Sequence, residues 1–240
     1  MPSSITLFAA GSLRLPFTAL LSQFTHQSGI DVKVEYGPAG LLRERIEAGE
    51  PCTLFASANR EHPQRLLAQQ KAAFTQTFSW NQLSLVSNRA GGWLDLLRDP
   101  TLRIATSTPG CDPSGDYTRA FFDNMDVLKP GLGQQLRARA IPLVGGRDTV
   151  RIPQGELASA WILRQGFADL FIGYAHYAHA LRAQPDVHYV AIPDEHNIRC
   201  EYQLAVIDAS QEVMALVEFI LSRSGQAFLT AAGFLPLNDE

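Results

Sequence analysis

Short apolar runs alternate with segments of helical spacing along the first third of the chain. Residues 5–10 and 54–56 are mostly apolar runs typical of buried strands, and residues 30–36 alternate between apolar and polar. Between these runs, residues 13–24 and 41–46 repeat apolar positions at the spacing of one helix face. Parallel strands need crossover connections of this length, usually helices. The order therefore predicts an α/β fold with a mostly parallel sheet that helices cover on both faces.

A second series of alternating elements follows a short helix predicted at 63–70. In chain order it comprises a strand at 83–86, a helix at 93–97, a strand at 103–106, helices at 114–125 and 157–166, a strand at 169–174, a helix at 177–184, and strands at 187–192 and 202–207. Residues 211–232 form one long helix or two. Because no Ser- or Gly-rich tether divides the sequence, two lobes would be joined by strands rather than by a loose linker.

The composition is that of an ordinary globular protein and narrows the choice of partners. Apolar residues make up 46% of the chain and charged residues 18%, which excludes a disordered polypeptide. The chain has 20 Lys and Arg and 24 Asp and Glu, which gives a formal net charge of -4. Nucleic-acid binding needs clustered basic residues, so we do not expect it. No apolar run in the sequence approaches the length of a membrane-spanning helix, which needs roughly 20 residues.

The first residues and the cysteines say little about function. Met1-Pro2-Ser3-Ser4 is not a basic segment followed by an apolar core, so we expect no signal peptide in this chain. The protein is then cytoplasmic, or its leader is not part of this sequence. Cys52, Cys111 and Cys200 are far apart, and their odd number leaves at least one thiol unpaired. We interpret them as small buried or half-buried thiols.

Familiar enzyme signatures are absent from the sequence. It contains no phosphate-binding GxxxxGK[ST] loop, GxGxxG, GxSxG, HExxH or EF-hand loop. His176 and His179 lie three apart on an expected helix and could share a metal, but the spacing marks no third ligand. We interpret the two histidines as part of a solvated helix face. No pair of nucleophile and base is visible, so we do not expect an enzyme.

The positive signal is a set of three turns rich in small residues, each between a predicted strand and a predicted helix. They span residues 9–13 around Ser12, residues 37–40 around Ala39, and residues 106–117, which contain several hydroxyls and Asp112. A helix start presents free N–H groups and the positive end of the helix dipole, which attract anions. Ser12 adds a hydroxyl, although serine is also a common N-cap without further function. In an open α/β sheet, ligands bind at the carboxyl ends of the strands.

Four segments and their order resemble a known family. They are residues 8–13 (FAAGSL), 42–49 (LRERIEAG), 55–59 (FASAN) and 166–174 (GFADLFIGY), and they resemble the molybdate- and tungstate-binding proteins of ABC importers. The ending at 221–226 (LSRSGQ) with Gly233-Phe234 is similar to the closing helix of type 2 periplasmic binding proteins. The resemblance covers nearly the whole chain. It implies two α/β lobes, residues 1–80 plus 201–240 and residues 81–200, with an oxyanion in the cleft between them.

The resemblance also assigns ligand donors. Ser12 matches a serine that offers its N–H and hydroxyl, and Tyr174 matches a tyrosine whose hydroxyl binds the oxyanion. Ala39 stands where the family has a second serine, so only its backbone N–H carries over. A further backbone N–H at a helix start maps near Glu156, within a residue or so.

Two acidic residues sharpen the expected ligand. The segments around Asp112 (DPSG) and Glu195 (PDEHN) resemble the archaeal tungstate-binding branch, in which two carboxylates bind the metal centre of the oxyanion. By Coulomb's law, the repulsion between a bare carboxylate and a dianion is on the order of several kcal/mol when both are desolvated. Bonding to molybdenum or tungsten removes that repulsion, whereas sulfur in sulfate does not expand its coordination. Alternatively, Asp112 only caps a helix and Glu195 faces water.

The sequence therefore favours a solute-binding protein that captures molybdate or tungstate and delivers it to an ABC permease. We expect no cofactor, no nucleic-acid partner and a monomer, placed in the periplasm or outside the cell. Three alternatives stay open: a sulfate-binding protein, a binding protein for a metal cation held by Asp112, Glu195 and Tyr174, and a cytoplasmic oxyanion sensor of the same fold.

Overall fold

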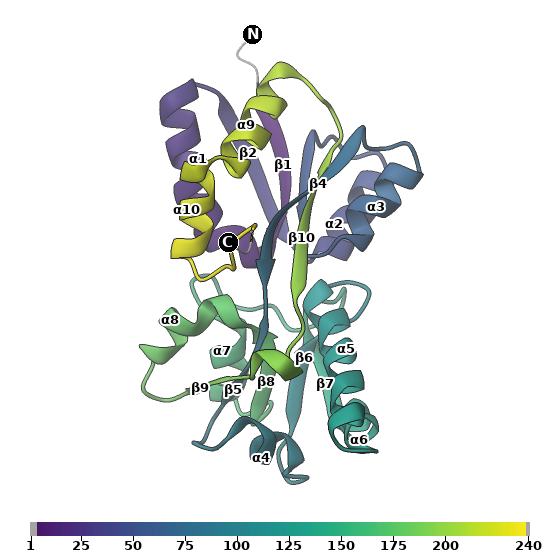
Figure 1. The fold of residues 1–240 in the computed structure, drawn as a ribbon, viewed down its shortest axis with the longest axis vertical. Helices are drawn as coiled ribbons and strands as arrows, with labels where there is room; N and C mark the ends of the chain where they lie inside the picture. The colour runs from purple at the N-terminus through teal and green to yellow at the C-terminus, as the bar shows by residue number, and fades with distance from the viewer. Residues whose placement is uncertain (1–3, 239–240) are drawn as a thin grey trace. The chain divides into compact units, whose positions relative to one another are not determined.

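The computed structural model describes residues 4–238 and divides into two compact units (Figure 1). Unit 1 consists of Met1–Asn81 with Glu201–Glu240, and unit 2 of Gln82–Cys200. Each unit is built on a five-stranded sheet. Residues 1–3, on which much of the expectation about a signal peptide rests, lie outside the described residues.

Unit 1 has the strand order β2-β1-β3-β10-β4. Its strands are β1 (Ser4–Ala10), β2 (Asp31–Gly37), β3 (Leu54–Ser57), β4 (Phe74–Asn81) and β10 (Cys200–Val206). Its helices are η1 (Gly11–Leu13), α1 (Arg14–Ser28), α2 (Ala39–Glu47), α3 (Glu61–Ala68), α9 (Gln211–Leu221) and α10 (Arg223–Ala231). Strands β2 and β3 both run parallel to β1, and β10 is antiparallel to β3. Phe17, Phe55, Phe78 and Tyr202 are fully buried in its core.

Unit 2 has the strand order β7-β6-β8-β5-β9. Its strands are β5 (Leu83–Ser87), β6 (Ile104–Ser107), β7 (Ala140–Val144), β8 (Leu170–Tyr174) and β9 (His188–Ala191). Its helices are α4 (Trp93–Arg98), α5 (Pro113–Leu128), α6 (Leu132–Arg139), α7 (Ala158–Arg164), η2 (Ala175–Tyr177), α8 (Ala178–Arg182) and η3 (Asp194–His196). Strand β6 runs parallel to β7 and β8, whereas β5 is antiparallel to β8 and β9.

The predicted α/β fold of sheets flanked by helices is confirmed, although both sheets contain antiparallel as well as parallel pairs and are mixed rather than mostly parallel. The hydrophobic pattern missed three elements. Strand β4 is rich in polar residues, β7 is an edge strand interrupted by Pro142, and α6 has only a narrow apolar stripe. The final segment forms two helices, because Ser222 adopts an extended conformation and its Oγ accepts from the N–H of Gly225. Within residues 4–238, no helix combines the length and apolar character needed to cross a bilayer.

Candidate functional site

The carboxyl ends of three parallel strands meet at one edge of the unit 1 sheet. Strand β1 leads into the turn at Ser12, β2 into the turn at Ala39, and β3 into residues 57–59. In the β1–β2 register Ala10 lies beside Gly37, so the first two turns are neighbours. Two of the predicted donors, Ser12 and Ala39, are therefore brought together within this unit.

Ser12 is held by a chain of side-chain hydrogen bonds that the sequence analysis missed. Its Oγ lies 2.8 Å from the hydroxyl of Tyr202 on β10, and Asn81 Nδ2 donates to that hydroxyl at 3.3 Å. All three residues are buried. Either oxygen of the Ser12–Tyr202 pair can be the donor; in the arrangement in which Tyr202 accepts from Asn81 and donates to Ser12 Oγ, the Ser12 proton is left for a ligand. In that arrangement Ser12 is a donor to the ligand, and the polarised bonds reinforce one another.

The first turn of α2 supplies backbone donors beside Ser12. No side chain among residues 4–238 caps this helix, and its first main-chain bond runs from Leu42 N–H to Pro38 O at 3.0 Å. The N–H groups of residues 39–41 precede that bond, at the positive end of the helix dipole. Ala39 is fully buried and contributes no hydroxyl, as expected.

A buried polar pair links α2 to α3 behind this edge. Arg43 Nε donates to His62 Nδ1 at 2.9 Å, and the same guanidinium pairs with Glu47 one turn further along α2. Burial, followed by the positive charges of Arg43 and Arg65, lowers the pKa of His62 to about 4. His62 is therefore neutral near pH 7, with Nδ1 as the acceptor. The pair fixes the two helices that follow β2 and β3; the sequence offered no motif for it.

Unit 2 gathers a second set of candidate residues at the carboxyl edge of its own sheet. The parallel strands β6, β7 and β8 end at Ser107, Val144 and Tyr174. The turn after β6 leads into α5, whose first turn is packed against the strand end. A Cβ built on Gly115 would lie 2.6 Å from Ser107 O, so only glycine permits this approach. The third predicted turn therefore has the expected strand-to-helix form.

Asp112 is the N-cap of α5 and lies against the loop after β7. Its Oδ1 accepts from Ser114 N–H at 3.1 Å, and a Cβ on Gly145 would lie 2.5 Å from its Oδ2. Desolvation is the main cause that raises the pKa of Asp112 to about 6; the Ser114 bond opposes it and the charge of Asp116 adds to it. The capping role that the sequence left open is thus present, on a carboxyl group whose charge is disfavoured.

Tyr174 ends β8 at the same edge. It is 7% exposed, and its ring lies edge-on to Tyr117 of α5 with centroids 6.5 Å apart. His176, two residues later, is buried rather than solvated, and its ring packs 3.8 Å from that of Tyr177. The expected solvated face is therefore wrong for His176, because these residues form the 3-10 turn η2 against the sheet, while His179 is exposed.

Two further predicted residues, Glu156 and Glu195, are exposed. Glu156 precedes α7, is exposed, and its N–H already donates to Pro153 O at 3.1 Å. The side chain of Glu195 in η3 is 75% exposed, and the neighbouring His196 carbonyl accepts from Asn124 of α5 at 3.5 Å. Asn124 is eleven residues beyond Pro113, roughly 16 Å along the helix at 1.5 Å per residue. The structure thus does not bring Glu195 to Asp112.

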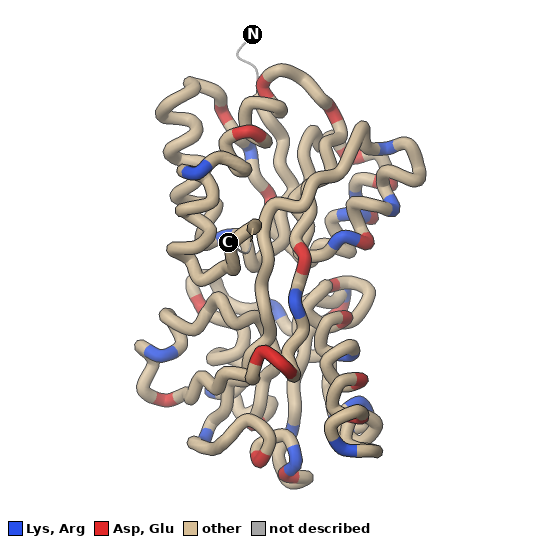
Figure 2. The backbone as a smooth tube through the Cα atoms, viewed as in Figure 1, with Lys and Arg blue, Asp and Glu red and all other residues tan. Residues whose placement is uncertain are grey.

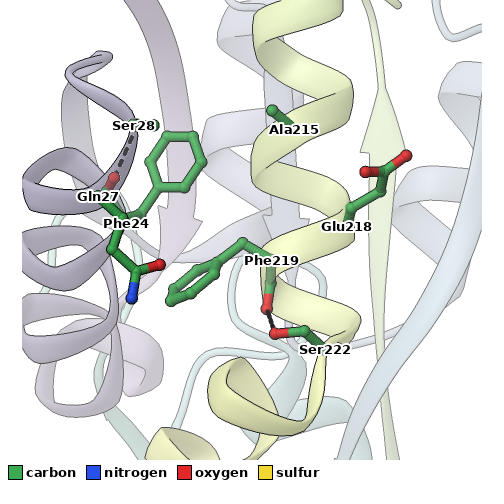
Figure 3. Close-up of a pocket in the computed structure, with 7 residues that line it drawn as sticks. All are labelled: Phe24, Gln27, Ser28, Ala215, Glu218, Phe219 and Ser222. Carbon is green, nitrogen blue, oxygen red and sulfur yellow. Dashed lines mark hydrogen bonds between the residues drawn. The ribbon is translucent and has the colours of Figure 1, made fainter.

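Other features of the described residues give no metal site and no further group of candidate binding residues. No three His, Cys, Asp or Glu side chains of residues 4–238 gather as a metal site, and the three cysteines are free thiols. A depression between α1 and α9 is lined by Phe24 and Phe219, and the hydroxyls of Ser28 and Ser222 there donate to main-chain carbonyls (Figure 3). Basic and acidic residues are interspersed along the described backbone of both units (Figure 2).

Similarity to known proteins places the chain in a family. It belongs to the bacterial extracellular solute-binding proteins, which it matches over residues 5–235. It is 43% identical over 239 residues to an uncharacterised protein of Pasteurella multocida, covering 97% of this chain and 98% of that one. It is 25% identical to the molybdate-binding protein ModA of Escherichia coli, covering 96% of this chain and 88% of ModA. The solved sulfate-binding protein SubI of Mycobacterium tuberculosis superposes with a TM-score of 0.77 at 22% identity, covering 98% and 88% of the two chains.

Proposed function

We propose that this protein, outside the cytoplasm, binds a tetrahedral oxyanion, molybdate or tungstate. It then delivers the oxyanion to an ABC permease. The observation that carries the proposal is the buried Ser12 hydroxyl, hydrogen-bonded to Tyr202 beside the first turn of α2, which no described side chain caps. A hydroxyl and adjacent free N–H groups form a donor set for oxyanion oxygens. The likeness to ModA along 96% of the chain supports this ligand class.

The proposed donors in unit 2 are the hydroxyl of Tyr174 and the turn that leads into α5. Neutral donors suit a dianion that must be released again, because they bind it without forming a buried ion pair. Asp112 is proposed to bond to the molybdenum or tungsten centre of the ligand. Its raised pKa is consistent with a carboxyl group that prefers to lose its free charge, by protonation or by bonding.

Thermal denaturation with and without ligand tests the proposal. Molybdate and tungstate should raise the melting temperature in proportion to the logarithm of their concentration, since they bind only the native state. Sulfate tests the alternative favoured by the likeness to SubI, and ferric ion tests a cation site. Ser12→Ala should reduce the molybdate shift while leaving the protein folded. A protein stabilised by ferric ion alone, or by none of the four, would refute the proposal.

A further inference from the structure

Strand β2 forms an open edge of the unit 1 sheet. Edge strands expose unpaired N–H and C=O groups, and proteins usually cover, shorten or interrupt them. The edge at β4 is covered by the C-terminal segment, whose Leu235 N–H donates to Trp80 O at 2.8 Å. The edge at β7 contains Pro142, and the edge strand β9 has only four residues. By contrast, β2 has seven residues and no proline, pairs with β1 without a bulge, and has no strand on its outer side within residues 4–238.

The two faces of β2 differ in character, because successive side chains of a strand point to opposite faces. One face presents half-buried apolar side chains that line a depression between α1 and β2, namely Val32, Val34 and Tyr36. The other face presents three exposed charged residues, Asp31, Lys33 and Glu35. Glu35 pairs with Arg45 of α2, yet its side chain is 57% exposed. Lys33 makes no ion pair with the rest of the described chain.

The order of these side chains is self-complementary. If two copies of β2 pair antiparallel along their whole length, Asp31 faces Gly37 and Val34 faces Val34 of the second copy. Lys33 then lies opposite Glu35 in both halves of the pair, and Val32 lies opposite Tyr36 on the apolar face. Opposite charges that face each other across antiparallel strands stabilise the pair, whereas like charges destabilise it.

Other registers lose this complementarity. A slip of one residue turns every side chain to the wrong face, so only shifts of two residues keep the apolar faces together. A shift of two in one direction places Lys33 opposite Lys33, and a shift of two in the other places Glu35 opposite Glu35. The register that uses the whole strand is therefore favoured over both neighbouring registers.

We propose that β2 pairs antiparallel with β2 of a second copy of this chain, so that the protein forms a reversible dimer through unit 1. The pairing satisfies the open N–H and C=O groups of the edge and covers the apolar face of β2. It departs from the monomer expected from the sequence. Seven residues a side are fewer than the roughly 20–30 of a standard interface, so the dimer should dissociate on dilution.

Charge reversal tests the pairing and its register together. The average mass of the full chain, measured by sedimentation over a range of concentrations, should rise from that of one chain toward that of two. Lys33→Glu places like charges opposite each other twice and should weaken dimerisation about tenfold, as should Glu35→Lys. The double variant with both changes restores the opposite pairs and should dimerise like the unchanged protein.

Lys71→Glu is the matched control. Lys71 is exposed on the segment between α3 and β4, away from β2, so the same change of charge there should leave the dimer unaltered.

Two kinds of result would overturn the proposal. A charged residue on an edge strand can also prevent pairing, and a chain that stays monomeric at every concentration would assign that role to Lys33. A dimer that resists both single reversals, or that the double variant fails to restore, would be formed by another surface. No ligand enters these measurements, so either failure leaves the proposed function standing.

Discussion

Replacing Tyr202 by Phe removes one oxygen atom and leaves the packing around it in place. The ring of Tyr202 meets Phe78 and Phe234 edge-on at centroid distances of 6.1 and 5.2 Å, and a phenylalanine ring keeps both contacts. The hydroxyl is the bridge between Asn81 and Ser12. The variant therefore removes the hydrogen bond to Ser12 without changing the packing of the core.

The size of the effect follows from the bonds removed. The hydrogen bonds of the Tyr202 hydroxyl with Ser12 and Asn81 are buried, and each contributes about 1 kcal/mol net, so the free energy of unfolding should fall by about 1–3 kcal/mol. Ser12 keeps its hydroxyl but loses the partner that directs its proton outward. We expect oxyanion affinity to fall about fivefold, close to 1 kcal/mol.

A double-mutant cycle measures this coupling. Molybdate affinity is determined by calorimetry for the unchanged protein, Ser12→Ala, Tyr202→Phe and the double variant. Because Tyr202 acts through Ser12, its replacement should have little further effect once the Ser12 hydroxyl is gone, and the two losses should not add. Urea denaturation of the same four proteins reports the stability separately.

Full additivity of the two losses would contradict this reasoning, because it would mean that Tyr202 acts on the ligand independently of Ser12. An unchanged affinity in Tyr202→Phe, alongside a clear loss in Ser12→Ala, would show that the Ser12 proton needs no orientation by the phenol.

Three further predictions concern other residues. Asp112→Asn should weaken molybdate and tungstate binding without improving sulfate binding, whereas stronger binding of all three would mean that Asp112 only repels the ligand; the exposed Glu195→Gln should be nearly neutral in the same titrations. Because the pKa of His62 falls to about 4 on folding, the stability that depends on its neutral form is complete above about pH 6.5 and is lost as the pH falls toward 4. Urea midpoints at pH 5 and 7.5 should therefore differ less in His62→Gln than in the unchanged protein, and an equal difference would assign the acid sensitivity elsewhere. Gly115→Ala should destabilise the protein by about 1–3 kcal/mol, since its Cβ would press on the Ser107 carbonyl; a wild-type melting temperature would show that the turn yields.

The alternation of apolar runs and helical faces was enough to predict the fold class and most of its elements. Strand burial and helix amphipathicity are properties of short segments, so they are visible without knowing what packs against them. Elements whose own sequence has a weak pattern were missed, because what packs against them determines their structure. Strand β4, with the sequence FTQTFSWN, is specified by its neighbours in the sheet rather than by its own alternation.

In the candidate site too, local features could be predicted from the sequence and long-range contacts could not. The sequence by itself marked the turns at Ser12, Ala39 and residues 106–117, because small residues and hydroxyls between a strand and a helix are a local signal. It could not reveal the Tyr202–Ser12 bond, which joins positions 190 residues apart. It also suggested that Asp112 and Glu195 act together. In the structure Asp112 caps the start of α5, whereas the residue next to Glu195 contacts Asn124, three turns further along that helix. Hydrogen-bond partners and burial depend on which distant segments the fold brings side by side, so only the tertiary structure decided them.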